Sequence, residues 1–225
     1  LLASLSTTAV VLPVFLLGGM SAIIRPELGF DERALGLMVG SYFGAAAVSS
    51  GLLGGLVGRV GARRSAMLAL MATTIASVGM ATAADRAAVI APLLMLAGVA
   101  NGMIQPAANL AIARRISVAR QGISFGIKQA AIPAATLLAG IALPVVALTV
   151  GWRWAYGAVA IVAPLIALGA FRRFPGRDAT VQATAGVADG GDGTAPALVR
   201  RRSSPLAGSR GRLTVLAVAG ALGSG

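Results

Sequence analysis

Three amide side chains recur at intervals of four residues inside a long run of the sequence that holds no charge. They are Asn101, Gln105 and Asn109, in the uncharged run 87–113. On a helix, residues four apart lie along one face that drifts slowly around the axis. Polar groups in apolar segments are costly, so each amide is a candidate for binding a polar solute. Amides also bond neighbouring helices together, and the sequence leaves this second interpretation equally open.

A cation and a fourth amide stand near the start of another apolar run, in the segment FGIKQAAIP. The ammonium group of Lys128 could balance the charge of an anionic solute, with Gln129 beside it. The alternative is that the Lys128 side chain extends to the cytoplasmic membrane surface, and the nearness of the predicted helix end favours it. Arg25 closes the first apolar run and is expected to end that helix rather than to bind an anion.

The residues that many enzymes use are missing. The sequence contains neither His nor Cys, which removes the usual ligand sets for zinc, haem and iron–sulfur clusters and the Ser–His and Cys–His nucleophiles. The seven carboxylates lie between uncharged runs or at their ends, so no proton carrier is expected inside a span. We predict that the protein is not an enzyme and has no metal site or cofactor, because a six-span membrane enzyme would have almost no reagents to use.

The composition is typical of a membrane protein, with 57% hydrophobic and 12% charged residues. About 20 apolar residues are needed to cross a bilayer as a helix, and most of the uncharged runs reach that length. Helices rather than barrel strands are expected, because the runs do not alternate in polarity. We predict six membrane-spanning helices, in the runs 1–24, 34–58, 65–84, 87–113, 129–152 and 154–171.

The positive charges alternate in number from one gap between runs to the next. The second, fourth and sixth gaps hold three, four and eight of the 19 Lys and Arg residues. The positive-inside rule places these gaps, and with them the N-terminus, in the cytoplasm. The net charge of +12 is therefore a signal of topology. No nucleic-acid partner is expected, because the sequence shows neither aromatic interleaving nor a folded basic face.

The predicted spans divide into two triplets of nearly equal length, at 1–84 and 87–171. A repeat with an odd number of spans inverts its topology, as in the three-plus-three repeats of many secondary transporters. The predicted fold is therefore an all-α polytopic bundle over 1–171, built from two inverted three-helix repeats. A flexible basic cytoplasmic linker is predicted over 172–212, and the truncated start of a seventh helix over 213–225. Because that last run is too short to span a bilayer and the chain opens on Leu1, we expect a fragment.

Glycines four residues apart crowd the second predicted span. This spacing lets helices approach backbone to backbone, so tight helix packing is predicted there. The carboxylates of Asp31 and Glu32 precede the span, where they can cap free N–H groups and favour the positive end of the helix dipole. The glycine pairs are Gly40 and Gly44, Gly51 and Gly55, and Gly54 and Gly58.

The gap after the second span carries the segment GGLVGRVGARR. It resembles the signature GxLxDRxGxRR that the major facilitator superfamily carries between its second and third helices. In that family the loop is understood to steady the outward-open state, with the aspartate in a charge relay. Gly58 stands where the family has this aspartate, which puts the relay in question but not the fold. The matching positions are Gly54, Leu56, Arg59, Gly61, Arg63 and Arg64.

Two further segments bear on this resemblance. GWRWAYG, at 151–157, resembles the junction between helices five and six in many bacterial members. QAAIPAATLLAG meets the family's antiporter pattern GxxxxGPxxGG poorly, because alanines stand where glycines belong. Exchange of a drug for a proton is therefore not implied.

The resemblance implies the N-terminal half of a secondary transporter that moves a small solute across a bacterial-type cytoplasmic membrane by alternating access. The implied partners are the solute, the lipid bilayer and a missing C-terminal six-helix half. Because helices one and four line the central cavity in the family, the three amides are expected to face the solute path. The alternative is a structural or sensory protein that kept the fold and lost transport, which Gly58 leaves open. Neither the solute nor the coupling ion is implied.

Overall fold

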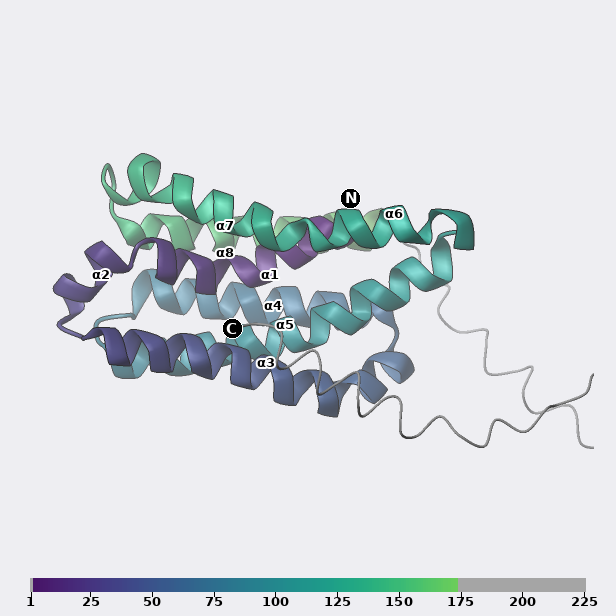
Figure 1. Ribbon diagram of the computed structural model, residues 1–225, viewed down its shortest axis with the longest axis horizontal. Coiled ribbons are helices and arrows are strands. Elements are labelled where there is room, and N and C mark those ends of the chain that lie inside the picture. Colours follow the sequence, from purple (N-terminus) through teal and green to yellow (C-terminus); the bar gives the residue numbers. More distant parts are fainter. Residues whose placement is uncertain (1, 174–225) are drawn as a thin grey trace, which may run out of the picture. The chain divides into compact units, whose positions relative to one another are not determined.

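The computed structural model describes residues 2–173, and all the regular structure in this range is helical (Figure 1). The predicted linker and seventh helix lie outside the described residues, except for Arg172 and Arg173, which end the last helix. The elements are α1 (Leu2–Gly19), α2 (Ser21–Leu28), α3 (Glu32–Val60), α4 (Ala62–Thr82), α5 (Ala87–Arg115), α6 (Val118–Gln129), α7 (Ala131–Ala142), the π-helical turn η1 (Leu143–Ala147) and α8 (Trp152–Arg173).

Six helical segments within residues 2–173 are long and apolar enough to cross a membrane, which confirms the six-span prediction. The fifth span differs from its prediction, since it begins at Ala119 rather than at 129. The helix continues through Lys128, because a single cation does not interrupt the hydrogen bonds of the backbone. The boundary of the uncharged run at 129 therefore marks the position of Lys128 and not the start of the span. The segments are Leu2–Gly19, Glu32–Val60, Ala62–Thr82, Ala87–Arg114, Ala119–Ala147 and Trp152–Gly169.

The fifth span is divided into three pieces by two prolines. α6 ends and α7 begins on either side of Ala130. Pro133 has no N–H group to donate to the carbonyl group of Gln129, and its ring crowds the preceding turn, so the helix breaks at this point. Pro144 lies in η1, where the ladder widens to bonds between residues five apart. The fifth span is thus a row of short helices rather than one rigid rod.

The principal contacts between spans follow an internal two-fold pattern. α3 packs along α5 and α7 packs along α1, on opposite sides of the bundle (Figure 1). α4 packs against α5 as α8 packs against α1, while α4 contacts α8 and α1 contacts α5. If the first, second and third spans are exchanged with the fourth, fifth and sixth, the same set of contacts is obtained. The packing is what two inverted three-helix repeats require.

α3 and α5 approach each other closely at two glycines of α5. A Cβ atom added to Gly98 would overlap the carbonyl oxygen of Tyr42. One added to Gly102 would overlap the Ser49 hydroxyl group and lie 2.6 Å from the carbonyl oxygen of Ala46. The four-residue spacing puts both glycines on the face that meets α3, and only glycine leaves room for its backbone.

The glycines of α3 itself do not make the close contact that their spacing predicts. The prediction was wrong because the buried face of α3 carries Met38, Tyr42, Ala46 and Ser49, and the glycines lie on its other faces. Spacing shows which faces of a helix can approach a neighbour, but not which face has one. Within residues 2–173, nothing within 4 Å would meet a Cβ atom at Gly40, Gly44, Gly51, Gly54, Gly55 or Gly58.

The GWRWAYG segment joins the start of α8 to three other parts of the bundle. Trp152 Nε1 donates to Glu27 Oε2 of α2 at 2.7 Å. Arg153 Nη2 donates to the Ala84 carbonyl group, just after α4, at 2.8 Å, and its guanidinium group lies 4.6 Å from the centre of the Trp152 ring. The Tyr156 hydroxyl group donates to a backbone carbonyl group of α1 at 3.1 Å. These bonds hold the end of the bundle where α2, α4 and α8 meet.

The start of α3 is capped as predicted. Asp31 Oδ1 accepts a hydrogen bond of 2.9 Å from the Ala34 N–H group, which satisfies one of the free donors of the first turn. Glu32 forms an ion pair of 2.9 Å with Arg25. Arg25 lies inside α2 and does not end a helix, so that part of the prediction was wrong.

Gly98→Ala is expected to destabilise the protein, because the new methyl group would overlap a backbone oxygen that cannot move independently of α3. Overpacking of this kind costs roughly 1–3 kcal/mol. The midpoint of thermal unfolding, measured on purified protein in detergent, should fall. Gly157→Ala in α8 is the matched control, since nothing within 4 Å would meet its Cβ atom. Unchanged midpoints for both variants would contradict the close approach of α3 and α5.

Candidate functional site

Four of the five predicted polar residues form one hydrogen-bonded group between α5 and α6. The Lys128 ammonium group donates to Gln105 Oε1 and, at 3.4 Å, to Gln129 Oε1. Gln105 Nε2 in turn donates to Asn101 Oδ1 at 3.3 Å, one turn away along α5. We call these four residues the Lys128 cluster. It connects the fourth span to the fifth through side chains alone.

Lys128 is buried, with 4% of its surface exposed. Its ammonium group bonds to α5, so the side chain does not extend to the membrane surface, and the prediction that it would do so was wrong. That prediction followed from the misplaced start of the fifth span, which in fact begins at Ala119. Asn101 and Gln105 are half-buried and Gln129 is exposed. The cluster therefore has a covered cation and an accessible amide edge.

The orientation of the amides follows from the cation. An ammonium group only donates, so Gln105 and Gln129 must both turn their oxygen atoms toward Lys128. The NH₂ group of Gln105 then points along α5, where the oxygen of Asn101 accepts from it. All three amide oxygens are engaged within the cluster. The N–H groups left over outnumber the second lone pairs that the three oxygens keep.

Asn109 does not join the cluster. Its side chain is exposed, and it makes no hydrogen bond within the described part of the chain. Each step of four residues turns about 40° around a helix, so Asn109 lies about 80° from Asn101. Of the three amides predicted to share one helix face, Asn101 and Gln105 are thus bonded to each other and Asn109 is separate.

Two hydroxyl groups of α1 flank the cluster, and neither was among the predicted site residues. Ser4 Oγ donates to the Ile127 carbonyl group at 3.2 Å, and Thr8 Oγ1 donates to the Ala131 carbonyl group at 3.4 Å. These carbonyl groups lie on either side of Lys128, at the break between α6 and α7. The signal available was the four-residue spacing of the two hydroxyl residues in the first uncharged run. They attach the first span to the fifth where the latter is interrupted.

The predicted signature segment forms the junction of α3 and α4. Gly61 is the single residue between the two helices, and its φ of 92° and ψ of 150° are rarely adopted by other residues. Arg59 is exposed in the last turn of α3, where a cation favours the negative end of the helix dipole. Arg63 is half-buried and Arg64 exposed in the first turn of α4. The remaining matched residues, Gly54 and Leu56, lie in α3.

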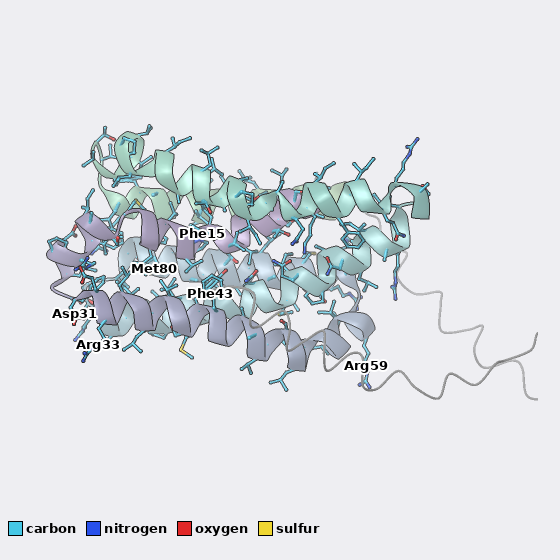
Figure 2. All side chains as sticks on the ribbon, in the orientation of Figure 1. Phe15, Asp31, Arg33, Phe43, Arg59 and Met80 are labelled. Atoms are coloured by element: carbon cyan, nitrogen blue, oxygen red, sulfur yellow. The ribbon has the colours of Figure 1, made fainter. Side chains whose placement is uncertain are left out.

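The junction lies beside a small cavity between α1, α4 and α5. The cavity has a volume of about 70 Å³, and Arg63 is its charged lining residue. Figure 2 shows Arg59 at the opposite end of α3 from Asp31 and Arg33. The signature and the capped start of α3 therefore lie at opposite ends of the second span. The other lining residues are Leu2, Ala3, Ser6, Ala66, Ile104, Ala107 and Ala108.

Comparison with known proteins decides the family. Residues 3–225 match the model of the Major Facilitator Superfamily. The chain belongs to the major facilitator superfamily. It is thus a multi-pass membrane protein of a transporter family, and not an enzyme.

One curated relative from Bacillus subtilis (strain 168) carries the description "Putative metabolite transport protein YwtG". It is 26% identical to this chain over 153 residues, which make up 68% of this chain and 33% of the relative. The chain thus spans about a third of the length of the curated relative it matches.

Gln105→Leu removes the acceptor of a buried ammonium group and is expected to lower the free energy of unfolding by roughly 1–3 kcal/mol. Adding Lys128→Met should recover part of this loss, because no unpaired buried charge then remains. Thermal unfolding of both proteins measures the difference. Asn109→Leu is the control on the same helix and should leave the midpoint unchanged. A double variant less stable than Gln105→Leu alone would contradict the pairing.

Gly61→Ala is expected to destabilise the junction of α3 and α4, because alanine is strained at the backbone angles of Gly61. The cost of such strain is roughly 1–3 kcal/mol. Gly58→Ala, three residues earlier inside α3, is the control, since its Cβ atom would meet nothing within 4 Å. Equal unfolding midpoints for the two variants would show that the junction can adopt another conformation at no cost.

Proposed function

We propose that this protein is a secondary transporter that moves a small solute by alternating access, and that the Lys128 cluster is part of its solute site. The observation that carries the proposal is a buried cation with an accessible amide edge inside two membrane spans. Polar groups at this depth are expensive and mark solute pathways in membrane proteins. Lipid alone would favour apolar side chains at these positions.

The internal two-fold pattern supports the mechanism. In transporters built from inverted repeats, the solute site lies near the middle of the membrane between repeats. Asn101 is near the middle of the fourth span, and Gln105 connects it to Lys128 of the fifth span. Both of these spans belong to the second repeat, and Ser4 and Thr8 of the first repeat donate to the backbone on either side of Lys128. We propose that a C-terminal six-helix half completes the cavity, and that rocking of the two halves exposes it to each side of the membrane in turn. The bilayer, the solute and this half are the proposed partners.

The proposed membrane is a cytoplasmic membrane of bacterial type, with the N-terminus in the cytoplasm. The distribution of Lys and Arg supports this orientation, because the positively charged gaps alternate with weakly charged ones. Arg59, Arg63 and Arg64 gather at one end of the second and third spans, and this end would face the cytoplasm. Their guanidinium groups would there meet lipid phosphates.

Gly58 favours a second candidate function. The superfamily signature has an aspartate at this position, and without it the charge relay implied by the resemblance has no carboxylate. A protein that kept the fold and lost transport could serve a structural or sensory role. Open space surrounds Gly58, so an aspartate fits there without rearrangement of its neighbours.

Uptake into proteoliposomes tests the two functions. The native-length protein would be reconstituted and offered radiolabelled sugars, amino acids and small organic acids, with protein-free liposomes as the background. Saturable uptake of at least one solute above this background is expected for a transporter. If the wild-type protein is inactive and Gly58→Asp is active, the fold is competent and the missing carboxylate limits transport. If neither protein moves any solute, the structural or sensory candidate replaces the transporter.

A further inference from the structure

We infer that the solute is a small anion with a carboxylate group, and that Lys128 is the residue that selects it. The inference rests on the proposed function, because it assigns a substrate class to the Lys128 cluster. It depends on two observations, the balance of charge around the ammonium group and the kind of hydrogen-bonding group that the cluster leaves free.

The charge of Lys128 has no carboxylate partner within residues 2–173. Its hydrogen bonds go to two neutral amides, Gln105 and Gln129. Amide oxygens solvate an ammonium group but do not cancel its charge, and a buried charge without a counter-ion is costly. An anionic solute would supply the missing charge. The four carboxylates in the described range are engaged near the ends of helices, far along the spans from the cluster: Glu27 with Trp152, Asp31 with Ala34, Glu32 with Arg25, and Asp85 with Arg86.

The hydrogen-bonding groups that the cluster leaves unused suit a solute that accepts hydrogen bonds. The amide oxygens of Asn101, Gln105 and Gln129 each already accept a hydrogen bond inside the cluster. What remains is one N–H group of the Lys128 ammonium, the NH₂ groups of Asn101 and Gln129 and the second N–H group of Gln105. These six N–H groups outnumber the three lone pairs, one on each amide oxygen, that are still free. A carboxylate offers two oxygen atoms that only accept, and its hydrogen bonds to a cation are stronger than those of a neutral group. A neutral polyol can accept from the same N–H groups, but it brings no negative charge to the ammonium group.

The geometry also provides a way in. Gln129 is exposed, and its bond to Lys128 is 3.4 Å long, while Lys128 and Gln105 are held more closely. A carboxylate can therefore displace the Gln129 oxygen from the ammonium group and leave the contact with Gln105 in place. Selection of the solute then depends on the contact between Lys128 and Gln129, which a carboxylate can replace. Stability of the cluster depends on the contact between Lys128 and Gln105, which stays in place.

Matched pairs of acids and amides separate charge from shape. The native-length protein in detergent would be titrated with acetate and acetamide, lactate and lactamide, succinate and succinamide, and benzoate and benzamide, at constant ionic strength. Ligand binding to the folded state raises the midpoint of thermal unfolding, which gives an apparent Kd. The same solutes, and neutral sugars, would be offered to proteoliposomes. Binding and transport are thus measured separately.

Four variants assign the selectivity to its residue. Lys128→Gln should weaken binding of the preferred acid at least roughly tenfold, the loss expected for a hydrogen bond to a charged group, and Lys128→Arg should restore most of it. Gln129→Glu places a carboxylate against the ammonium group at an exposed position and should weaken binding of the acid without loss of folding. Arg120→Gln removes a positive charge from the exposed face of the same helix and should bind as the wild type does.

The outcomes distinguish this inference from the proposed function. Acid-selective binding that depends on the charge at position 128 supports the inference. If such binding is found but no solute is taken up, the inference is supported and the transport proposal fails. Uptake of neutral sugars with no acid-selective binding overturns the inference and leaves the transporter. Equal binding of acids and amides, acid binding that survives Lys128→Gln, or no binding of any acid also overturns it.

Discussion

The absence of water inside a bilayer is the constraint on which the rest of this structure depends, because each backbone polar group within a span must find its partner in the protein and an unpaired side-chain polar group is costly. The bundle meets it with side chains that donate to the backbone of another helix. Ser4 and Thr8 donate from α1 to the fifth span, and Tyr156 donates from α8 to α1. Arg153 does the same at the end of α4. These bonds fix the helices that apolar contact alone would leave free to slide in lipid.

The Lys128 cluster meets the same constraint in a different way. Had a carboxylate of the protein faced Lys128, the pair would have been neutral, and a solute would have had to compete with it. Two amides hold the ammonium group instead, which satisfies two of its three N–H groups and leaves its charge. The cluster is therefore stable enough to exist in the empty bundle and still attractive to an anion. Its burial strengthens that attraction, since charges interact more strongly away from water.

The spans and the helix cap could be predicted from the sequence because both depend on local composition. Asp31 caps α3 through a residue three positions away, and the uncharged runs follow the spans wherever no charge lies inside one. Lys128 broke this rule, because its partner Gln105 is 23 residues distant and a local count of charge cannot register it. Ser4 and Thr8 were missed for a related reason. A hydroxyl group can donate to the backbone of its own helix, as Thr73 does to Ala69, so its presence in the sequence does not indicate a bond to another helix.

The two contacts that the internal symmetry relates differ in the continuity of their helices. α3 meets α5 at Gly98 and Gly102, where the backbones almost touch and neither helix is broken. The equivalent contact joins α1 to the fifth span, which is interrupted near Ala130 and again at η1. A helix bends at such interruptions at less cost than in a continuous stretch. The Lys128 cluster joins the segmented fifth span to α5, which is continuous although it contains Pro92 and Pro106. A change of angle in α6 would therefore move Lys128 relative to Gln105. The inverted repeat thus has one continuous and one interrupted copy of the same contact, with the cation on the interrupted span and the amide that holds it on the continuous one.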